Sequence, residues 1–142
     1  MLGELLFSKT TLPVTLKVMD TGMLRARTIA NNIANVNTPG YRRVEVSFED
    51  ALRGALDRTR LRGTQTDSRH IQMGKRDLSQ VKAEAYEPAD PTQPSGVNNV
   101  DIDSEMSKLA ENQIMFNYGV KFAKGTFSKL NAAITGKSVP MQ

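Results

Sequence analysis

The feature that most limits what this sequence can fold into is a C-terminal run of residues spaced alternately by four and three positions. Nine of its ten positions are apolar, and the tenth is Gln113. This spacing keeps every member on one stripe of an α-helix. Such a helix would be roughly 50 Å long at 1.5 Å per residue. The run consists of Ile102, Met106, Leu109, Gln113, Phe116, Val120, Ala123, Phe127, Leu130 and Ile134.

Local signals mark both ends of this helix. Asp101 precedes the first member of the run, where its side chain can accept hydrogen bonds from the first free backbone N–H groups. Asp103 and Glu105 add negative charge to the first turn, which the helix dipole favours. Gly136 follows the last member and is a natural stop. We therefore predict a helix that begins after Asp101 and ends before Gly136.

A shorter run with the same spacing lies near the N-terminus. It stops at Asn37, and Thr38-Pro39-Gly40 then ends the helix. Because neither stripe is stable when exposed alone, we expect the two helices to pack antiparallel, with Leu12 opposite Ile134 and Met19 opposite Phe127. The N-terminal run consists of Leu12, Leu16, Met19, Met23, Ala26, Ala30 and Ile33.

These patterns predict a mainly α fold, with long N- and C-terminal helices packed as an antiparallel coiled-coil hairpin and a small irregular middle region. The middle region is expected to contain a short helix over residues 47–56, capped by Ser47 and Asp50, and an extended, mobile linker around three prolines. The expected units are 1–41 (N-terminal helix and the segment after it), 42–83 (middle insert), 84–100 (Pro-rich linker), 101–136 (C-terminal helix) and 137–142 (tail).

Gln113 is the one polar member of the C-terminal stripe, and two interpretations of it stay open. It can be a tolerated polar residue whose amide reaches water, or a buried amide that specifies register or partner, as single amides do in coiled coils.

Few residues suggest chemistry. The chain has no Cys, which excludes disulfides and thiolate metal sites. Asp67, Ser68 and His70 are close in sequence, but a catalytic triad is recognised by geometry, so they are weak evidence. The stretch DIDSEM at 101–106 begins like a calcium loop but has Met106 where that loop needs Gly. We expect no catalytic residues, no cofactor and no metal.

The charge and the N-terminus restrict the possible partners and location. The net charge is +4, and residues 42–76 hold nine Lys or Arg against five Asp or Glu. Such a basic middle can bind an acidic partner or nucleic acid, but no nucleic-acid-binding motif accompanies it and a solvated face is the simpler interpretation. The N-terminus lacks the basic segment of a secretory signal peptide, and no apolar run is long enough to span a membrane.

The stretch ANNIANVNTPGY at residues 30–41 resembles the N-terminal signature of bacterial flagellar axial proteins of the rod and hook group. The matching positions are Ala30, Asn31, Asn32, Ile33, Ala34, Asn35, Thr38, Gly40 and Tyr41. Residues 96–122 resemble the second characteristic block of that group. The short chain is most similar to the proximal-rod members.

The resemblance implies a structural subunit of the proximal rod of the flagellar basal body, which self-assembles helically into the drive shaft that transmits torque for motility. It also implies export by the flagellar type III apparatus without a cleaved signal peptide, and a location in the rod within the periplasm. The implied partners are further copies of the chain, other rod proteins, the rod-base adaptor and the MS ring. The alternative is a soluble coiled-coil adaptor whose basic middle binds an acidic partner or nucleic acid.

The asparagines of the signature are unexpected in a helix, because an amide side chain competes for backbone hydrogen bonds. On the heptad, Asn31, Asn32 and Asn35 point away from the predicted seam, so we expect them to contact neighbouring subunits or to stabilise the turn; local capping alone is the simpler possibility. Asn37 and Thr38 are expected to hold the helix end. The expected assembly residues are Asn31, Asn32, Asn35, Asn37, Thr38, Pro39, Gly40 and Tyr41.

Overall fold

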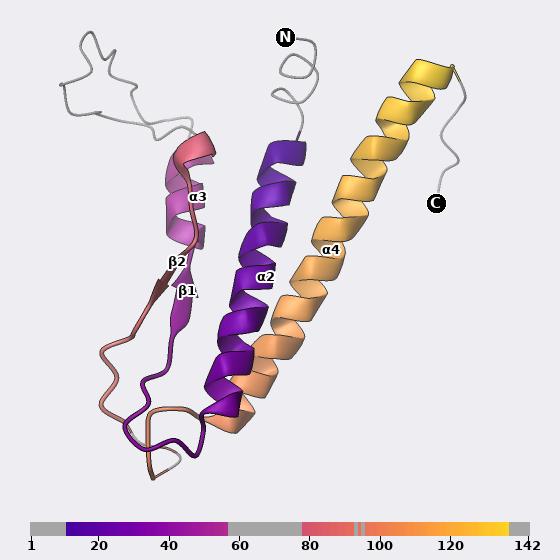
Figure 1. Ribbon diagram of the computed structural model, residues 1–142. Coiled ribbons are helices and arrows are strands. Elements are labelled where there is room, and N and C mark those ends of the chain that lie inside the picture. The colour runs from indigo at the N-terminus through magenta and orange to yellow at the C-terminus, as the bar shows by residue number, and fades with distance from the viewer. Residues whose placement is uncertain (1–10, 57–77, 93, 95, 137–142) are drawn as a thin grey trace, which may run out of the picture.

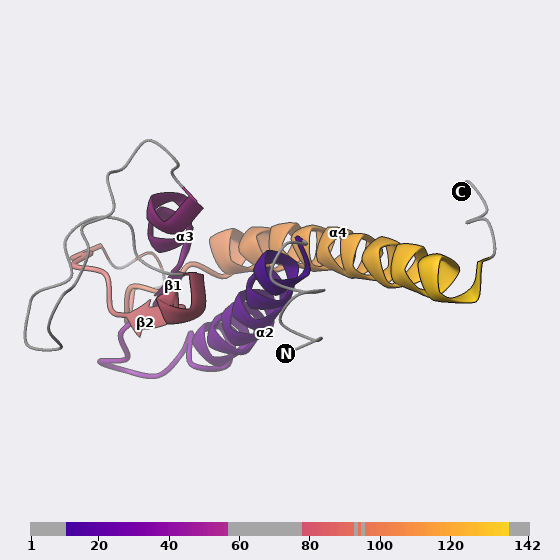
Figure 2. The ribbon, with the colours of Figure 1, turned by 90° about the horizontal axis from the view of Figure 1, so that it is seen from above.

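A computed structural model describes residues 11–56, 78–92, 94 and 96–136 (Figure 1). Helices α2 (Leu12–Ala34) and α4 (Ile102–Thr135) lie side by side and antiparallel. The N-terminal half of α4 accompanies α2, whereas its C-terminal half extends away from it (Figures 1 and 2). The predicted mainly α hairpin is confirmed. The basic stretch around Arg60 and the cluster around His70 lie outside the described residues.

Both predicted ends of the long C-terminal helix are confirmed. The Asp101 side chain accepts hydrogen bonds from the backbone N–H groups of Asp103 at 3.0 Å and Ser104 at 3.4 Å. At the other end, Gly136 has a φ of 67°, in the left-handed region that glycine adopts without steric cost. The residues that cap α4 were therefore predictable from sequence alone.

A smaller layer packs against α2 and also contacts the N-terminal half of α4 (Figures 1 and 2). Strands β1 (Glu45–Ser47) and β2 (Glu84–Tyr86) pair antiparallel, with Glu45 opposite Tyr86. Helix α3 (Glu49–Leu56) follows β1, and a 3₁₀ helix (Leu78–Gln80) precedes β2. The core of this layer consists of Phe48, Ala55 and Val81, with Val18 of α2 packed against them.

Two features of the middle region differ from prediction. The short helix begins at Glu49, because Ser47 belongs to β1. The expected linker over 84–100 contains β2, and its last three residues, 98–100, are buried. The prolines of this segment lie between β2 and residues 98–100, so they interrupt neither. Pairing with β1 therefore holds one end of the segment in place, and burial at the hairpin holds the other.

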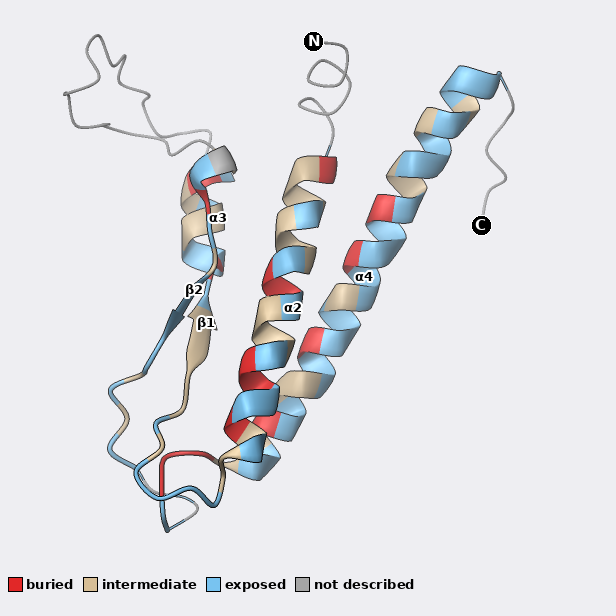
Figure 3. Cartoon of the chain, in the orientation of Figure 1, coloured by how far each residue is buried: buried red, intermediate tan, exposed pale blue. Residues whose placement is uncertain are grey.

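The contact face between α2 and α4 shares only part of the predicted stripe, because at alternate positions the residue one place earlier is buried instead. Figure 3 shows the buried residues at intervals along both helices. Part of each predicted run does face inward or lie partly buried: Leu12, Met19, Ala26 and Ile33 on α2, and Leu109, Phe116, Ala123 and Leu130 on α4. The other members of each run are exposed instead: Leu16, Met23 and Ala30, and Ile102, Met106, Gln113, Val120, Phe127 and Ile134.

Four small or hydrogen-bonding residues, together with Ile29, replace exposed members of the runs in the interface. Gly22 and Ile29 of α2, and Glu105, Asn112 and Gly119 of α4, are buried, each one position before a member that was predicted to be buried. Glycines let the helix backbones approach closely, and a buried amide can bond across the interface. A count of apolar residues does not detect either effect.

The register also differs from the predicted alignment. A Cβ atom added at Gly119 would lie 3.0 Å from Cγ of Met19, and one added at Gly22 would lie 3.3 Å from Cδ2 of Phe116. Met19 therefore lies opposite Gly119 and not opposite Phe127. The predicted alignment of Leu12 with Ile134 is wrong by slightly more than one heptad.

Candidate functional site

The asparagine-rich signature folds into what we call the helix-end junction, where the end of α2, the turn at 35–44, residues 98–99 and the first turns of α4 meet. Asn32 is at its centre and is fully buried. Its amide N–H group donates to the Val44 carbonyl at 2.8 Å, and its Oδ1 accepts from the Val44 N–H at 3.0 Å. One side chain thus pairs with both backbone groups of Val44, as a neighbouring strand would, and directs the chain into β1.

Asn32 also joins the turn to α4. Its Nδ2 donates to Oε2 of Glu105 at 2.8 Å, and its Oδ1 accepts from the Tyr41 hydroxyl at 3.0 Å. Burial, followed by the negative charges of Glu105 and Glu87, raises the pKa of Tyr41 above its usual value. Tyr41 therefore remains protonated, as its role as a donor requires.

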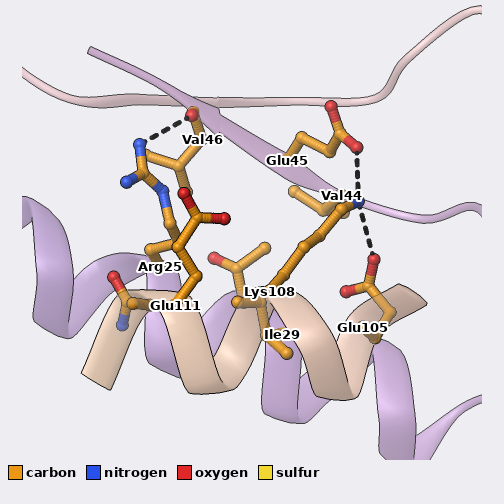
Figure 4. A pocket seen from close by; sticks show the side chains of 10 residues that line it. Arg25, Ile29, Val44, Glu45, Val46, Glu105, Lys108 and Glu111 are labelled. Carbon is orange, nitrogen blue, oxygen red and sulfur yellow. Dashed lines mark hydrogen bonds and ion pairs between the residues drawn. The ribbon is translucent and has the colours of Figure 1, made fainter. Parts of the chain in front are cut away.

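Glu105 is a carboxylate with an exposed fraction of only 1%, and its second oxygen is satisfied by a cation. Lys108 contacts Oε1 of Glu105 at 3.0 Å and Oε1 of Glu45 at 2.9 Å (Figure 4). Burial alone would lower the pKa of Lys108, but its bonds to Glu45 and Glu105 outweigh burial and raise it. Lys108 therefore connects α4 to β1 and compensates two negative charges.

The carbonyls of the turn that follows α2 are satisfied by a residue distant in sequence. Nδ2 of Asn98 donates to the carbonyl oxygens of Asn35 at 2.9 Å, Val36 at 3.0 Å and Thr38 at 3.0 Å. Within the signature, the Thr38 hydroxyl donates to Oδ1 of Asn35 at 3.2 Å. These contacts supply donors to the chain directly after the end of α2, where the regular helical hydrogen bonds stop.

The next asparagine fixes the chain after the turn. Oδ1 of Asn99 accepts from the Arg43 backbone N–H at 2.7 Å. The Arg43 guanidinium lies 3.3 Å from both Glu45 and Asp90. Sequence reasoning missed Asn98 and Asn99; the signal was the second Asn-Asn pair, placed directly before a helix start.

The structure divides the predicted assembly residues into two groups. Asn32 is buried and bonded to Val44 and Glu105, so the expectation that its side chain faces a neighbouring subunit is wrong, whereas its expected role in the turn fits these bonds. The heptad assignment placed Asn32 outward because it ignored the turn and β1, which cover that side of α2. Asn35 donates to the Asn31 carbonyl at 2.8 Å, and its contact with a neighbouring subunit stays a prediction. The polar members Asn31, Asn37 and Thr38 are exposed, as are Pro39 and Gly40.

A pocket of about 210 Å³ lies between the hairpin and β1 (Figure 4). Apolar side chains of Ile29, Val44 and Val46 line it, and charged groups of both signs surround them. Arg25, at its edge, bonds Glu49 at 2.7 Å. Within the described part of the chain, no group of three His, Cys, Asp or Glu residues could hold a metal ion.

The exposed members of the two runs form a surface that we call the outer stripe: Leu16, Met23, Ala30, Ile102, Met106, Gln113, Val120, Phe127 and Ile134. On each helix these residues mostly come one position after the buried ones. In an antiparallel pair, that offset turns both sets toward the same side of the hairpin. The layer with β1 and α3 contacts other positions of α2, including Lys17 and Arg25. The outer stripe is therefore a long apolar surface that the described part of the chain leaves uncovered.

An elongated helical hairpin with a hydrogen-bonded junction and an apolar stripe that the described residues leave uncovered is typical of a structural subunit of a larger assembly. Comparison with known proteins identifies which one. The sequence model of the family described as "Flagella basal body rod protein" matches residues 25–42, which include the whole signature.

Curated relatives extend the match over most of the chain. The chain is 34% identical to the flagellar basal body rod protein FlgB of Bacillus subtilis (strain 168) over 113 residues, which cover 80% of this chain and 84% of the relative. It is 31% identical to FlgB of Borreliella burgdorferi over 126 residues, with 83% and 90% covered. FlgB of Escherichia coli (strain K12) is 31% identical over 107 residues, with 71% and 75% covered.

The chain therefore belongs to the FlgB family of flagellar basal body rod proteins. It is a structural subunit of the rod, which serves motility, and its relatives are structural rod proteins and not enzymes. No helix among the described residues is both long and apolar enough to cross a membrane.

Proposed function

We propose that this rod subunit assembles by packing its outer stripe against helices of neighbouring subunits, both further copies of this chain and other rod proteins. The observation that carries the proposal is the exposure of large apolar residues at heptad spacing, with Met23 55% and Phe127 52% exposed. Seven-residue spacing along a helix suits a second helix as partner, because knobs on one helix then fit holes on the other.

The location and the specific partners of the subunit are inferred from the family resemblance. We infer that the subunit belongs to the proximal rod in the periplasm, where it contacts the rod-base adaptor and the MS ring. We also infer that the flagellar type III apparatus exports it without a cleaved signal peptide, and that it has no enzymatic activity.

Two exposed asparagines of the signature complete the proposed surface. Asn31 follows Ala30 of the outer stripe, and Asn37 lies in the exposed turn. Their amides offer both donors and acceptors to a neighbouring subunit, and because an amide does not titrate, such contacts are less sensitive to pH than ion pairs.

A substitution on the outer stripe tests the proposed surface. Val120→Glu places a charge at an exposed stripe position, and Ser107→Glu places the same charge at an exposed position of α4 outside the stripe. Both variants should keep the helix content of the parent by circular dichroism. We expect Val120→Glu to be exported but not incorporated into isolated rods, with loss of swimming, and Ser107→Glu to be incorporated normally. Normal incorporation of Val120→Glu would exclude the outer stripe as an assembly surface.

A further inference from the structure

Three contacts define how α2 and α4 are aligned along their axes. Nδ2 of Asn112 donates to the carbonyl oxygen of Gly22 at 2.9 Å, and Asn112 is buried. One end of the interface is held by the Asn32–Glu105 bond, and at the other Met19 packs against Gly119. The Asn112 amide thus lies between two contacts of different kinds.

Gly22 makes the Asn112 contact possible. A Cβ added there would lie 3.7 Å from Oδ1 of Asn112, an ordinary contact distance, and 3.3 Å from Cδ2 of Phe116, which is tighter than most such contacts. The acceptor is a carbonyl in the middle of α2, whose second lone pair can accept a bond from outside the helix. Glycine at position 22 therefore leaves room for the Asn112 side chain beside the carbonyl that it bonds.

Apolar packing alone does not select this alignment. Both runs repeat every seven residues, so a shift by about one heptad again brings apolar residues together. In the alignment with Leu12 opposite Ile134, Asn112 would instead face the last turn of α2 at Ala34. Glu105 would lie beyond the end of α2, near Tyr41.

The shifted alignment would leave polar groups without partners. A buried amide or carboxylate that loses its partner costs much more free energy than a satisfied one contributes. The apolar side chains, by contrast, would exchange one set of apolar neighbours for another of similar size. The polar contacts consequently discriminate between registers that apolar packing treats alike.

We propose that Asn112 is the register-determining residue of the hairpin: its buried amide, bonded to the Gly22 carbonyl, holds α2 and α4 in the observed alignment against heptad-shifted ones. Gln113, the polar residue of the predicted seam, is exposed and donates to Asn117 on its own helix, so the register role falls to the residue directly before it.

The alignment has a consequence for the outer stripe. If apolar contacts alone determined the packing, the helices would turn Leu16, Met23 and Val120 inward, as the predicted stripe requires. With Asn112 and Glu105 in the interface, these residues stay outside. The use of these exposed residues for assembly rests on the proposed function, whereas the register role of Asn112 does not.

Cysteine trapping tests the register directly, because the chain has no cysteine of its own. One reporter carries Met19→Cys and Gly119→Cys, which are adjacent in the observed alignment. The other carries Leu16→Cys and Leu130→Cys, which are adjacent only in the shifted one. Each pair is placed in the full-length parent, in Asn112→Leu and in Asn117→Leu, and the disulfide yield is measured under mild oxidation.

In the parent and in the Asn117→Leu control, the 19–119 pair should be trapped and the 16–130 pair should not. In Asn112→Leu, the ratio of 19–119 to 16–130 yield should fall about tenfold, as expected for loss of one buried hydrogen bond that discriminates the registers. An unchanged ratio in Asn112→Leu, or comparable trapping of both pairs in the parent, would overturn the proposal. Trapping requires no rod assembly, so its failure is distinct from a failure of the outer stripe to assemble.

Discussion

Asn32 and Glu105 are 73 positions apart in sequence, yet the amide of the first donates to the buried carboxylate of the second at 2.8 Å. The bond joins the two segments that make the family recognisable, the signature at the end of α2 and the block at the start of α4. It explains how a helix can accommodate several asparagines. Asn32 forms hydrogen bonds with the turn, β1 and α4 at once. The free-energy cost of placing an asparagine in a helix is small compared with the contribution of these four side-chain hydrogen bonds.

Replacing Asn32 should therefore destabilise the chain strongly. Asn32→Ala removes the partner of the buried Glu105 carboxylate and of both backbone groups of Val44, so we expect a loss of about 3–5 kcal/mol in the free energy of unfolding. Urea unfolding followed by circular dichroism measures the loss. Asn31→Ala, at the exposed neighbouring position, should change the stability by only about 0.5 kcal/mol. Similar losses in the two variants would contradict the central role of Asn32.

Asn98 provides a second test of the helix-end junction. Asn98→Ala leaves carbonyls of the turn directly after α2 without their donor, which should reduce stability by about 1–3 kcal/mol. Hydrogen exchange should show faster opening in the last turn of α2 than in its middle. The exposed Asn37→Ala is the matched control and should leave exchange in that turn unchanged; an equal effect of both substitutions would show that Asn98 does not secure the helix end.

The sequence predicted elements well and side-chain partners poorly. Helix α4 could be placed to within a residue because Asp101 and Gly136 are local signals. The hairpin followed from the need to bury two apolar stripes. The buried positions of the interface could not all be predicted, because they depend on Gly22, Gly119 and Asn112, which gain significance only when the opposite helix is in place.

At the helix-end junction, too, the sequence predicted the element but not the partners of its side chains. The signature identified the family, but the heptad assigned Asn32 to the outside, since that scheme contains no turn and no strand. Asn98 was predictable neither from spacing nor from propensity, because its partners at 35–38 come close only after the hairpin forms. Long-range polar contacts of this kind leave no periodic trace in a single sequence.

Acid should weaken the contact between α4 and β1. Burial alone would raise the pKa of Glu45, but the hydrogen bond and charge of Lys108, with Arg43 nearby, hold that pKa below its usual value of 4.5. A carboxylate whose pKa is lowered by folding contributes stability above its unfolded pKa and loses it as the pH falls through the folded pKa. Stability should therefore decline below about pH 4.5.

Glu45→Gln tests this contribution. Unfolding free energies at several pH values between neutrality and pH 3 should show a shallower decline in the variant than in the parent. Glu49, whose pKa is also lowered because the hydrogen bond and charge of Arg25 outweigh its burial, contributes in the same direction and stays in both proteins. Identical slopes would show that Glu45 does not link stability to pH.

The two interior glycines of α4 allow the close approach of the helices to be tested with the same substitution at two sites. A Cβ at Gly125 would meet nothing within 4 Å, so Gly125→Ala should stabilise the chain by about 0.5–1 kcal/mol through helix propensity. A Cβ at Gly119 would lie 3.0 Å from Cγ of Met19, so the same propensity gain must compete with displacement of a packed side chain. We expect Gly119→Ala to be less stable than the parent in thermal unfolding. Equal stabilisation by both substitutions would show that α2 does not approach α4 closely at Gly119.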